Sequence, residues 1–478
     1  MPLDTSKTAP TPNAIVSAAP DRAVNGACAD NEKLLADLDP IFDVQFGKHD
    51  HVVLAVSGGS DSIALMYLAI SWRRRKGITG TRLPNFSVVT IDHGLRPESA
   101  AEAVTVSDVA AALGLPHTTL VWRDPKPKTG VQAAARAARR ELLSAHLSHN
   151  NWRAVAMAHT IDDQAETLLM RLARGSGIDG LGAMRAVSKL AVGQSIVRPL
   201  LGTRKRMLMD YLVADGIGWI EDPTNQSRGF ERVRTRDLIR AAADHEIGLE
   251  TEALARSATR LARASDALAS LTVRAWAERG SSAHFNRFGY ATLRLNWLLE
   301  HPEEIRLRLL AGLLNVIGGQ EAKVSLGKLE TLTSALYLEP DCLAGKTFHG
   351  AKIDPMKPNG ENGPELMITR ETGRQLGAQT ALSPGTSLLW DRRFRIAIDK
   401  KSPGGLVVGP TGKAGVDILL RAGWSIGGVP PDALQTQPAL WILDGAGQAV
   451  LAAVPLAGYS RPELAGMVQC ETVQPEFC

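Results

Sequence analysis

The hexapeptide Ser57–Ser62, with the sequence SGGSDS, is the part of the chain that points most directly to chemistry. It follows the apolar run Val52–Val56 and precedes the helical pattern Ile63–Leu68. A strand that turns through two glycines into a helix presents unpaired backbone N–H groups, and the positive end of the helix dipole, to an anion. The pattern predicts a phosphate-binding loop; an ordinary strand-to-helix turn with Ser60 or Asp61 as the N-cap is the alternative.

The hexapeptide differs from the two common phosphate-binding motifs. It lacks the Gly-Lys-Ser/Thr ending of a Walker A loop, and therefore any lysine that could reach a β- or γ-phosphate. It also does not match the GxGxxG pattern of dinucleotide-binding folds. The sequence predicts a backbone cradle for phosphate with no lysine from the loop itself.

A second group of polar residues, HTIDDQAET at 159–167, follows the expected strand Ala154–Ala158. Asp163 and Glu166 are three residues apart, and Asp162 and Glu166 are four apart, so these acids share one face of a helix. The two aspartates lie in its first turn, where the helix dipole favours anions. Taken alone, the pattern favours an acidic helix start beside a histidine with satisfied hydrogen bonds; an active-site role is the alternative.

A third polar loop, DHGLRPES at 92–99, follows the expected strand Phe86–Ile91. Its glycine could bring the backbone and Arg96 close to a nucleotide. A plain turn between a strand and a helix explains the loop equally well. This loop becomes informative only in combination with the other two.

The elements that must position these loops alternate in type. Between about residues 48 and 200, short β-rich runs alternate with helical runs, which is typical of βαβ units in a parallel sheet. The expected strands are Val52–Val56, Phe86–Ile91, His117–Val121 and Ala154–Ala158. Ligands of open α/β sheets bind where loops gather at the carboxyl ends of the strands, so the three polar loops are expected to converge.

Composition excludes several classes of protein. The 478 residues suffice for two or three domains, and 44% hydrophobic with 22% charged residues is typical of a globular protein. No apolar run of about eighteen residues is present, so no membrane span is expected. The four cysteines form no CxxC pair, which argues against a disulfide framework, a zinc ribbon and an iron–sulfur cluster and favours the cytoplasm. The net charge of +4 permits a nucleic-acid partner.

Basic residues gather after the expected sheet, around the turn-rich segment Glu221–Asn225. Helical patterns follow over 251–279, 302–317 and 326–338, and short β-like runs follow a Pro-, Gly- and Asn-rich passage at 354–364. A solvated helical face is the alternative to a nucleic-acid contact for these side chains. The basic residues around the turn are Arg204, Lys205, Arg206, Arg228, Arg232, Arg234, Arg236 and Arg240. In the helical pattern over 251–279, Leu254, Leu261 and Leu268 lie on one stripe, and Arg256, Arg260 and Arg263 lie on another.

The hexapeptide resembles the SGGxDS loop of the ATP pyrophosphatases, which holds the pyrophosphate of ATP while AMP is transferred. Over about residues 48–240 the chain resembles the tRNA(Ile)-lysidine synthases; the similarity is weaker in the helical region and faint beyond about 340. The matching motifs follow the family's order: SGGSDS, DHGLRPES, ARAAR at 135–139, AHTIDDQAET at 158–167, RLARGSG at 171–177, GLGAM at 180–184, RPLL at 198–201 and EDPTN at 221–225.

The resemblance implies a fold class and a domain order. The expected fold is α/β: a parallel-sheet ATP pyrophosphatase domain (adenine nucleotide α-hydrolase-like), then a helical middle domain and a small α+β C-terminal domain. We expect a disordered or extended segment over 1–45 and the catalytic domain over 46–240. A mainly helical tRNA-binding domain is expected over 241–345, and a C-terminal tRNA-recognition domain over 346–478.

The resemblance also implies a reaction. The family's ligases join free L-lysine to the 2-carbonyl carbon of the wobble cytidine of isoleucine tRNA with a CAU anticodon, using ATP and Mg²⁺ and releasing AMP and pyrophosphate. The lysidine formed changes codon and amino-acid specificity. A cytosine carbonyl oxygen is a poor leaving group, so adenylation must precede attack by lysine. We expect a cytoplasmic enzyme without a membrane partner, and the oligomeric state, a homodimer included, stays open.

Site residues follow from the same resemblance, residue by residue. The ATP-binding residues implied are Ser57, Gly58, Gly59, Ser60, Asp61, Ser62, His93 and Arg96, with Asp61 also linked to the metal. The catalytic residues implied are Asp61, Arg139, His159 and Asp163; lysine would bind at Asp163 and Glu166, and tRNA at Arg228, Arg232, Arg234 and Arg236. Either Asp163 or His159 would receive the proton from lysine. The chain departs from the family at Arg140, usually tyrosine, and at Val233, usually asparagine.

Two other functions compete with this one. A sister enzyme of the same loop class would transfer sulfur or ammonia, but sulfur transfer needs reactive cysteines near the loop and amidation needs an ammonia source, and neither is found in the sequence. A non-catalytic tRNA-binding module would have no need for a pyrophosphate cradle beside an acidic helix turn. Pyrophosphate release that requires tRNA and lysine together separates the three hypotheses.

Overall fold

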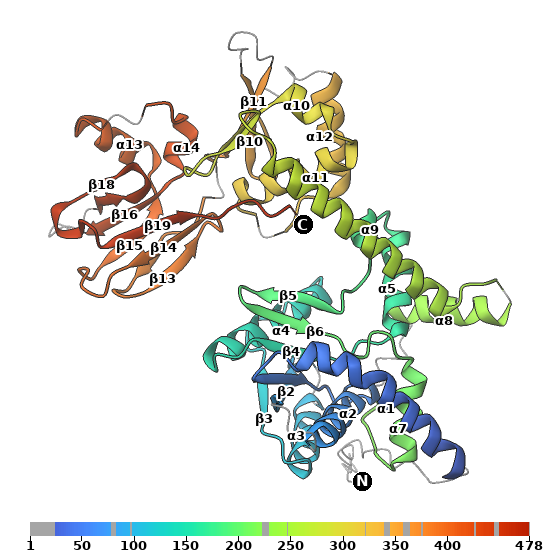
Figure 1. Cartoon of the computed structure of the whole chain (residues 1–478). Coiled ribbons are helices and arrows are strands. Elements are labelled where there is room, and N and C mark those ends of the chain that lie inside the picture. The colour runs from blue at the N-terminus through green and yellow to red at the C-terminus, as the bar shows by residue number, and fades with distance from the viewer. Residues whose placement is uncertain are drawn as a thin grey trace, which may run out of the picture. The chain divides into compact units, whose positions relative to one another are not determined.

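The computed structural model describes residues 24–77, 83–95, 98–221, 229–245, 247–320, 322–338, 345–356, 364–373, 376–424, 427–443 and 449–477. The chain divides into two compact units, Met1–Arg263 and Ala264–Cys478 (Figure 1).

The first unit alternates helices and strands. Its elements are α1 (Val24–Phe46), β1 (His51–Ala55), α2 (Ser60–Gly77), β2 (Asn85–Asp92), α3 (Ser99–Ala112), β3 (His117–Val121), α4 (Val131–His149), β4 (Ala154–Met157), α5 (Ile161–Ala173), α6 (Ile178–Leu181), β5 (Val187–Ala191), β6 (Gln194–Val197), α7 (Lys205–Ala214), α8 (Glu231–Asp244) and the first half of α9 (Thr251–Ala277). The four strands predicted from the sequence are each found within one residue of their expected bounds.

A six-stranded sheet forms the centre of this unit, in the order β3-β2-β1-β4-β6-β5. Strands β3, β2, β1, β4 and β6 run parallel, and β5 pairs antiparallel with β6 at the edge. The predicted α/β class with a parallel sheet is therefore confirmed, with one antiparallel edge hairpin that the sequence pattern did not reveal.

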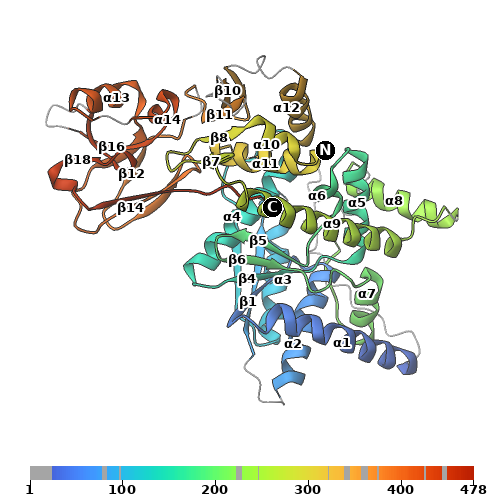
Figure 2. The same cartoon turned by 45° about the horizontal axis from the view of Figure 1, so that its top comes forward.

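Helices cover both faces of the sheet, as Figure 1 and Figure 2 show. Alternate residues of β1 point to opposite faces: Val52 and Leu54 pack with α1, α2, α3 and α7, whereas Val53 packs with α4. Its central residues Val52, Val53 and Leu54 are apolar because both faces of the strand are buried there. Since β1 and β4 are parallel neighbours, the loops that follow them leave the sheet side by side.

Helix α1 corrects one expectation. Leu34, Leu38, Phe42 and Phe46 recur every four residues and are each at most 3% exposed, so they form one buried stripe. Phe42 and Phe46 stack with ring centroids 4.9 Å apart. The prediction of a disordered or extended segment over 1–45 is therefore wrong for residues 24–45, which form α1, and the apolar stripe from Leu34 onward packs into the core of the first unit.

The second unit contains three antiparallel sheets, ordered β7-β8-β11-β10-β9, β12-β15-β16-β17-β18 and β13-β14-β19. Its elements are β7 (Ala283–Phe285), β8 (Ala291–Arg294), α10 (Leu295–Glu300), α11 (Glu303–Ile317), α12 (Leu326–Leu338), β9 (Lys346–Phe348), β10 (Ala351–Met356), β11 (Glu365–Arg370), β12 (Thr380–Leu382), β13 (Ser387–Trp390), β14 (Phe394–Ile398), β15 (Leu406–Pro410), α13 (Gly412–Arg421), α14 (Pro431–Gln435), β16 (Pro438–Leu443), β17 (Ala449–Val454), β18 (Tyr459–Ser460) and β19 (Val468–Thr472). The helices predicted over 302–317 and 326–338 are α11 and α12, which share a core with the first of these sheets.

A buried charge cluster connects two of these sheets. Asp391 accepts from Arg370 Nε at 3.2 Å and from Arg393 Nε at 2.7 Å, and both guanidinium side chains are at most 2% exposed. Arg393 Nη2 also donates to the Thr436 carbonyl at 2.5 Å. These bonds satisfy charges that would otherwise be costly to bury, and they fix β11 to the β13–β14 hairpin.

None of the helices in the part of the chain that the structure describes is long and apolar enough to cross a membrane.

Candidate active site

The loop after β1 is held in one conformation by its own serines and by a distant segment. Ser62 Oγ accepts from the Ser57 N–H at 3.1 Å and donates to the Gly59 carbonyl at 2.9 Å. Gly58 has φ +90°, and a Cβ there would lie 2.6 Å from Ile220 Cδ1. The Ile220 N–H donates to the Gly58 carbonyl at 2.9 Å. Only glycine fits this position, and Ser62 shapes the loop from within.

Asp61 lies in the first turn of α2 and forms an ion pair with Lys205. Lys205 Nζ is 2.9 Å from Asp61 Oδ2, and Ser60 Oγ donates to Asp61 Oδ1 at 3.2 Å. Burial raises the pKa of Asp61 above its usual range, although the Lys205 ammonium opposes this shift. Lys205 was not among the predicted site residues, because nothing in the basic run at 204–206 indicates that its second residue reaches the loop.

The N-terminus of α5 is closed by a capping box. Asp163 Oδ2 accepts from the Thr160 N–H at 2.8 Å and from Thr160 Oγ1 at 3.0 Å, and Thr160 caps the helix in return. Burial works against ionisation of Asp163, but Arg232, His159 and the Thr160 bonds outweigh it and lower the pKa of this carboxyl. Asp163 is therefore an ionised carboxylate whose Oδ1 faces Arg232 Nη2 at 3.5 Å.

Glu166 lies one turn further along α5 and is 2% exposed. Its Oε1 accepts from Arg236 Nε at 2.8 Å, and its Oε2 lies 3.1 Å from Arg232 Nε. Burial raises the pKa of Glu166, with Arg236 opposing the shift. Both guanidinium groups come from α8, so two of the arginines predicted to bind tRNA face the predicted lysine-binding carboxylates in this structure.

His159 immediately precedes this helix start. Arg198 Nε lies 3.3 Å from His159 Nδ1, in a geometry for donation. Burial lowers the pKa of His159 to about 4; the charges of Arg198, Arg232 and Arg139 add to the effect, and Asp163 opposes it. His159 is therefore neutral at pH 7. Arg198 belongs to the RPLL motif, to which the sequence analysis assigned no role.

Asp162 has a structural role. Its Oδ2 accepts from the Lys205 N–H at 2.8 Å, and its Oδ1 lies 3.0 Å from Arg204 Nη1. Arg204 in turn forms two bonds to Glu252, at 2.6 and 3.0 Å. The carboxylate of Asp162 thus caps the N-terminus of α7 and fixes it to α5.

The structure brings together most residues predicted from the sequence. Asp61 and Asp163 lie close enough to influence each other's ionisation, as do His159, Arg139 and Arg232. Arg139 Nη2 lies 3.3 Å from His93 Nε2, which places the loop after β2 at the same site. Arg234 is exposed and donates to the Gly229 carbonyl at 3.1 Å.

Two predicted residues, Arg96 and Arg228, lie outside the described residues.

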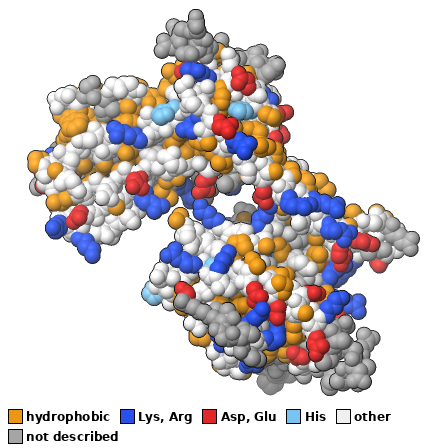
Figure 3. Space-filling model, in the orientation of Figure 1, with side chains coloured by type: hydrophobic (Ala, Val, Ile, Leu, Met, Phe, Trp, Pro, Cys, Tyr) orange, Lys and Arg blue, Asp and Glu red, His pale blue; other side chains and the backbone are white. Residues whose placement is uncertain are grey.

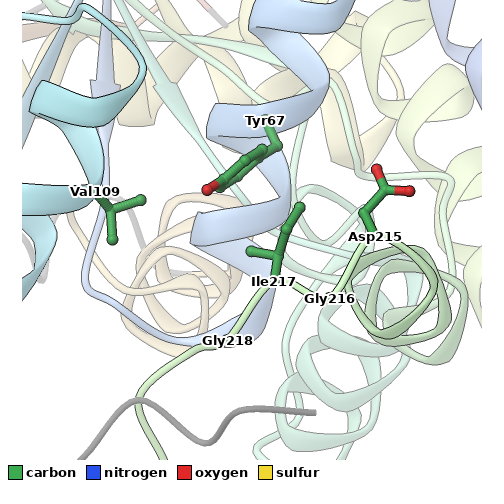
Figure 4. A pocket seen from close by; sticks show the side chains of 6 residues that line it. All are labelled: Tyr67, Val109, Asp215, Gly216, Ile217 and Gly218. Atoms are coloured by element: carbon green, nitrogen blue, oxygen red, sulfur yellow. The ribbon is translucent and has the colours of Figure 1, made fainter. Parts of the chain in front are cut away.

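The first unit also contains a cavity of about 600 Å³. It is lined by Tyr67 of α2, Val109 of α3 and the segment 215–218 after α7, and Figure 4 shows Tyr67, Val109 and Ile217 pointing toward the same space. None of the predicted site residues lines this cavity. We therefore place the candidate site at the polar loops.

The donor set suits a magnesium ion that arrives with a nucleotide. Within the described ranges, no group of three or more His, Cys, Asp or Glu side chains is arranged to hold a metal. Mg²⁺ is commonly bound by one or two carboxylates together with substrate phosphates, and Asp61 at the phosphate loop is such a carboxylate.

Basic side chains also cover part of α9. Arg256, Arg260 and Arg263 are exposed, and Figure 3 shows Lys and Arg side chains grouped over this helix. Leu254 and Leu261 pack instead into a small apolar cluster with α5. The two predicted stripes of this helix are confirmed for the part that belongs to the first unit.

The fold and the loop define a PP-loop domain, and the family model of that description matches residues 31–242. The tRNA(Ile)-lysidine synthase of Bradyrhizobium diazoefficiens is 46% identical over 301 residues, covering 60% of this chain and 78% of that protein. That of Ruegeria pomeroyi is 35% identical over 415 residues, covering 85% and 89%. The chain therefore belongs to the tRNA(Ile)-lysidine synthase family.

Among solved structures, the U34-tRNA thiolase NcsA from Methanococcus maripaludis with its [4Fe-4S] cluster aligns with 48% of this chain and 80% of that chain. The TM-score of this alignment is 0.41 at 15% sequence identity.

Proposed function

We propose that the chain ligates lysine to the 2-carbonyl carbon of the wobble cytidine of an isoleucine tRNA, with ATP converted to AMP and pyrophosphate. One observation carries this proposal: the phosphate-binding loop with Asp61 and the helix start with His159 and Asp163 meet at the carboxyl ends of the parallel neighbours β1 and β4. One side of the site suits the triphosphate, and the other suits an amine.

The loop supports the first half-reaction. Backbone N–H groups at the start of α2 and the helix dipole favour the negative charge of the triphosphate. Asp61 would hold Mg²⁺ together with the phosphates, and the bound ion would supply further positive charge to stabilise the pyrophosphate. Transfer of AMP to the cytidine oxygen converts a poor leaving group into a good one.

Asp163 is the better candidate for receiving the lysine proton. Arg198 donates to His159 Nδ1, so in the neutral ring the hydrogen is on Nε2, and His159 offers a donor rather than an acceptor toward the site. Asp163 is ionised, and its helix-capping hydrogen bonds use Oδ2, so Oδ1 takes no part in the cap and can accept a proton. We therefore assign the proton to Asp163 Oδ1, and to His159 a hydrogen bond that orients the cytidine adenylate.

Free lysine would bind beside Asp163 and Glu166. A lysine ammonium has a pKa of about 10.4 in water, and nearby positive charges lower the pKa of an amine. Arg232 and Arg236 supply such charges within the same cluster. The two carboxylates attract the ammonium form, and the two guanidinium groups offset the rise in amine pKa that the carboxylates alone would cause, so that the proton can pass to Asp163.

The tRNA would be bound mainly through its phosphates, because backbone contacts position a nucleic acid whereas base contacts specify it. In the predicted set, Arg234 is the described arginine with an exposed side chain, whereas Arg232 and Arg236 contact carboxylates. We propose that Arg234 binds phosphate and that the exposed arginines of α9 extend this surface. Recognition of tRNA by residues 241–345 and 346–478, and a cytoplasmic location, stay predictions.

The test is to measure pyrophosphate release with each substrate omitted in turn. We expect full release only when ATP, Mg²⁺, tRNA and lysine are all present, and a tRNA product heavier by one lysine residue. Sulfide and ammonium ions in place of lysine are the controls for a sister enzyme. Release that depends on either of them, or tRNA binding without any release, would contradict the proposal.

A further inference from the structure

The phosphate-binding loop has a lysine partner that its own motif lacks. Lys205, 144 residues after Asp61, is the first residue of α7, and its Nζ lies 2.9 Å from Asp61 Oδ2. Resting on the proposed function, we propose that Lys205 binds the β- and γ-phosphates of ATP. Before ATP arrives, its ammonium takes the place of the metal ion at Asp61.

The base of this side chain is fixed and its tip is free to move. The Lys205 N–H donates to Asp162 at 2.8 Å, and Arg204 holds the same carboxylate at 3.0 Å, so the start of α7 is fixed to α5. The Lys205 side chain itself is 41% exposed. Lysine carries a compact ammonium on a flexible four-carbon stem, which suits a group that exchanges one anionic partner for another.

The exchange keeps charges paired in both states. Without nucleotide, the ammonium compensates the Asp61 carboxylate, whose side chain is only 21% exposed. When the triphosphate enters, its oxygens offer the three ammonium N–H groups new acceptors, and Asp61 becomes available to the metal. Mg²⁺ alone would have to displace the ammonium without offering it another partner. Metal and nucleotide are therefore expected to bind together.

A purely structural ion pair is a weaker explanation. Ion pairs that solvent reaches contribute little to folding stability. The start of α7 is already fixed by Asp162, whose bonds to Lys205 use the backbone rather than the side chain. The side chain of Lys205 therefore adds little to the position of α7, and its placement at the loop favours a ligand role.

The first measurement is nucleotide affinity by calorimetry with Mg²⁺ present. We expect Lys205→Ala to weaken ATP binding about tenfold or more through loss of a charge-assisted hydrogen bond, and Lys205→Arg to retain most of the affinity. Affinity for AMP, which lacks the β- and γ-phosphates, should change less than about twofold. Arg206→Ala is the matched control, since this neighbour is 87% exposed and pairs only weakly with Asp210 at 3.8 Å.

The second measurement is Mn²⁺ binding without nucleotide, monitored through the electron paramagnetic resonance signal of the free ion. Lys205→Ala should bind Mn²⁺ more tightly than the wild-type chain, because Asp61 has lost its competing ammonium. A merely structural lysine would not move ATP and Mn²⁺ affinity in opposite directions.

An unchanged ATP affinity, an equal loss of ATP and AMP binding, or no gain in Mn²⁺ affinity would overturn the role of Lys205. Failure of the wild-type chain to bind ATP would instead contradict the proposed function.

Discussion

His159 and Asp163 are four residues apart, and each influences the protonation of the other. Burial is the main reason that His159 stays neutral, and the Arg232 charge that favours ionised Asp163 adds to it, because positive charge favours a carboxylate and disfavours an imidazolium. The two side chains can therefore take different roles in one reaction, although they are neighbours in sequence.

Asp163→Asn tests the proton acceptor. An asparagine side-chain oxygen can still accept from Thr160, so the helix cap should persist, but the amide cannot take the lysine proton. We expect lysidine formation to fall about 100-fold or more, and tRNA affinity to stay within about twofold. Single-turnover assays and filter binding measure the two quantities. An Asn variant with near-normal turnover would remove Asp163 from the mechanism.

His159 should make the folded chain sensitive to acid. The pKa of His159 is about 4 in the folded chain and about 6.5 in the unfolded chain. Between pH 6.5 and pH 4, His159 therefore binds a proton in the unfolded chain but not in the folded chain. The stability linked to this residue is complete above pH 6.5 and lost as the pH falls toward 4. We expect the wild type to lose on the order of 2 kcal/mol more than His159→Gln between pH 7 and pH 4.5, by urea unfolding. Equal losses would contradict the neutral assignment.

The sequence predicted a site residue best where the residues that form that part of the site are contiguous in the chain. SGGSDS could be interpreted as a phosphate loop because the glycines, the preceding strand and the following helix are contiguous. Lys205 and Arg198 could not be found in this way, since their contacts to Asp61 and His159 cross 144 and 39 residues and leave no local periodicity.

At the scale of elements, α8 is the structure that completes the acidic side of the site. Its Arg232 and Arg236 face Glu166, while Arg234 is exposed, so alternate arginines of one helix face different surroundings. The run of arginines was predicted to act as one tRNA-binding group. The structure separates it into two sets.

Arg236→Ala should destabilise the first unit. Glu166 is 2% exposed, and loss of its shortest bond leaves a buried carboxylate undercompensated, at a cost of about 1–3 kcal/mol in the free energy of unfolding. Adding Glu166→Gln should recover part of this loss, because it removes the buried charge. Arg234→Ala, on the same helix, should change stability by less than about 0.5 kcal/mol. Urea denaturation measures all three, and equal effects of the two arginine variants would contradict this separation.

Arg234→Ala should instead act on tRNA. Loss of one phosphate contact weakens binding and reduces the slope of log affinity against log salt by about one. Filter binding across a series of salt concentrations measures that slope. An unchanged slope would show that Arg234 contacts no phosphate.

Strands were easier to predict than the elements at the edges of the first unit. The four central parallel strands are apolar runs bounded by polar loops, and each was placed within one residue. The β5–β6 hairpin is short and partly exposed, so its strands do not stand out as apolar runs between polar loops. Helix α1 was missed because its apolar stripe follows a start rich in small and polar residues.

At the scale of the whole molecule, the two units divide between Arg263 and Ala264, inside α9. The boundary predicted from the sequence lies at 240/241, next to the turn-rich and basic region. Linkers between domains are usually recognised by glycine- and proline-rich sequence, and α9 contains neither residue. Composition therefore could not reveal a boundary inside this helix.

Unfolding should reflect the two separate cores. Buried clusters of the first unit and of the second unit form around different sheets, and such chains often depart from a single two-state transition. We expect two transitions in calorimetry, and ATP with Mg²⁺ should raise only the one that belongs to the first unit, because a ligand stabilises the part that binds it. A single transition, or an equal shift of both, would contradict this.

The bond between the Ile220 N–H and the Gly58 carbonyl has a consequence for biosynthesis. A ribosome makes the hexapeptide long before it makes Ile220, so the emerging polypeptide carries the motif without the segment that secures its left-handed glycine. We therefore expect the loop to reach its final conformation only after Ile220 has been made, and a product truncated before Ile220 would carry the motif without this bond.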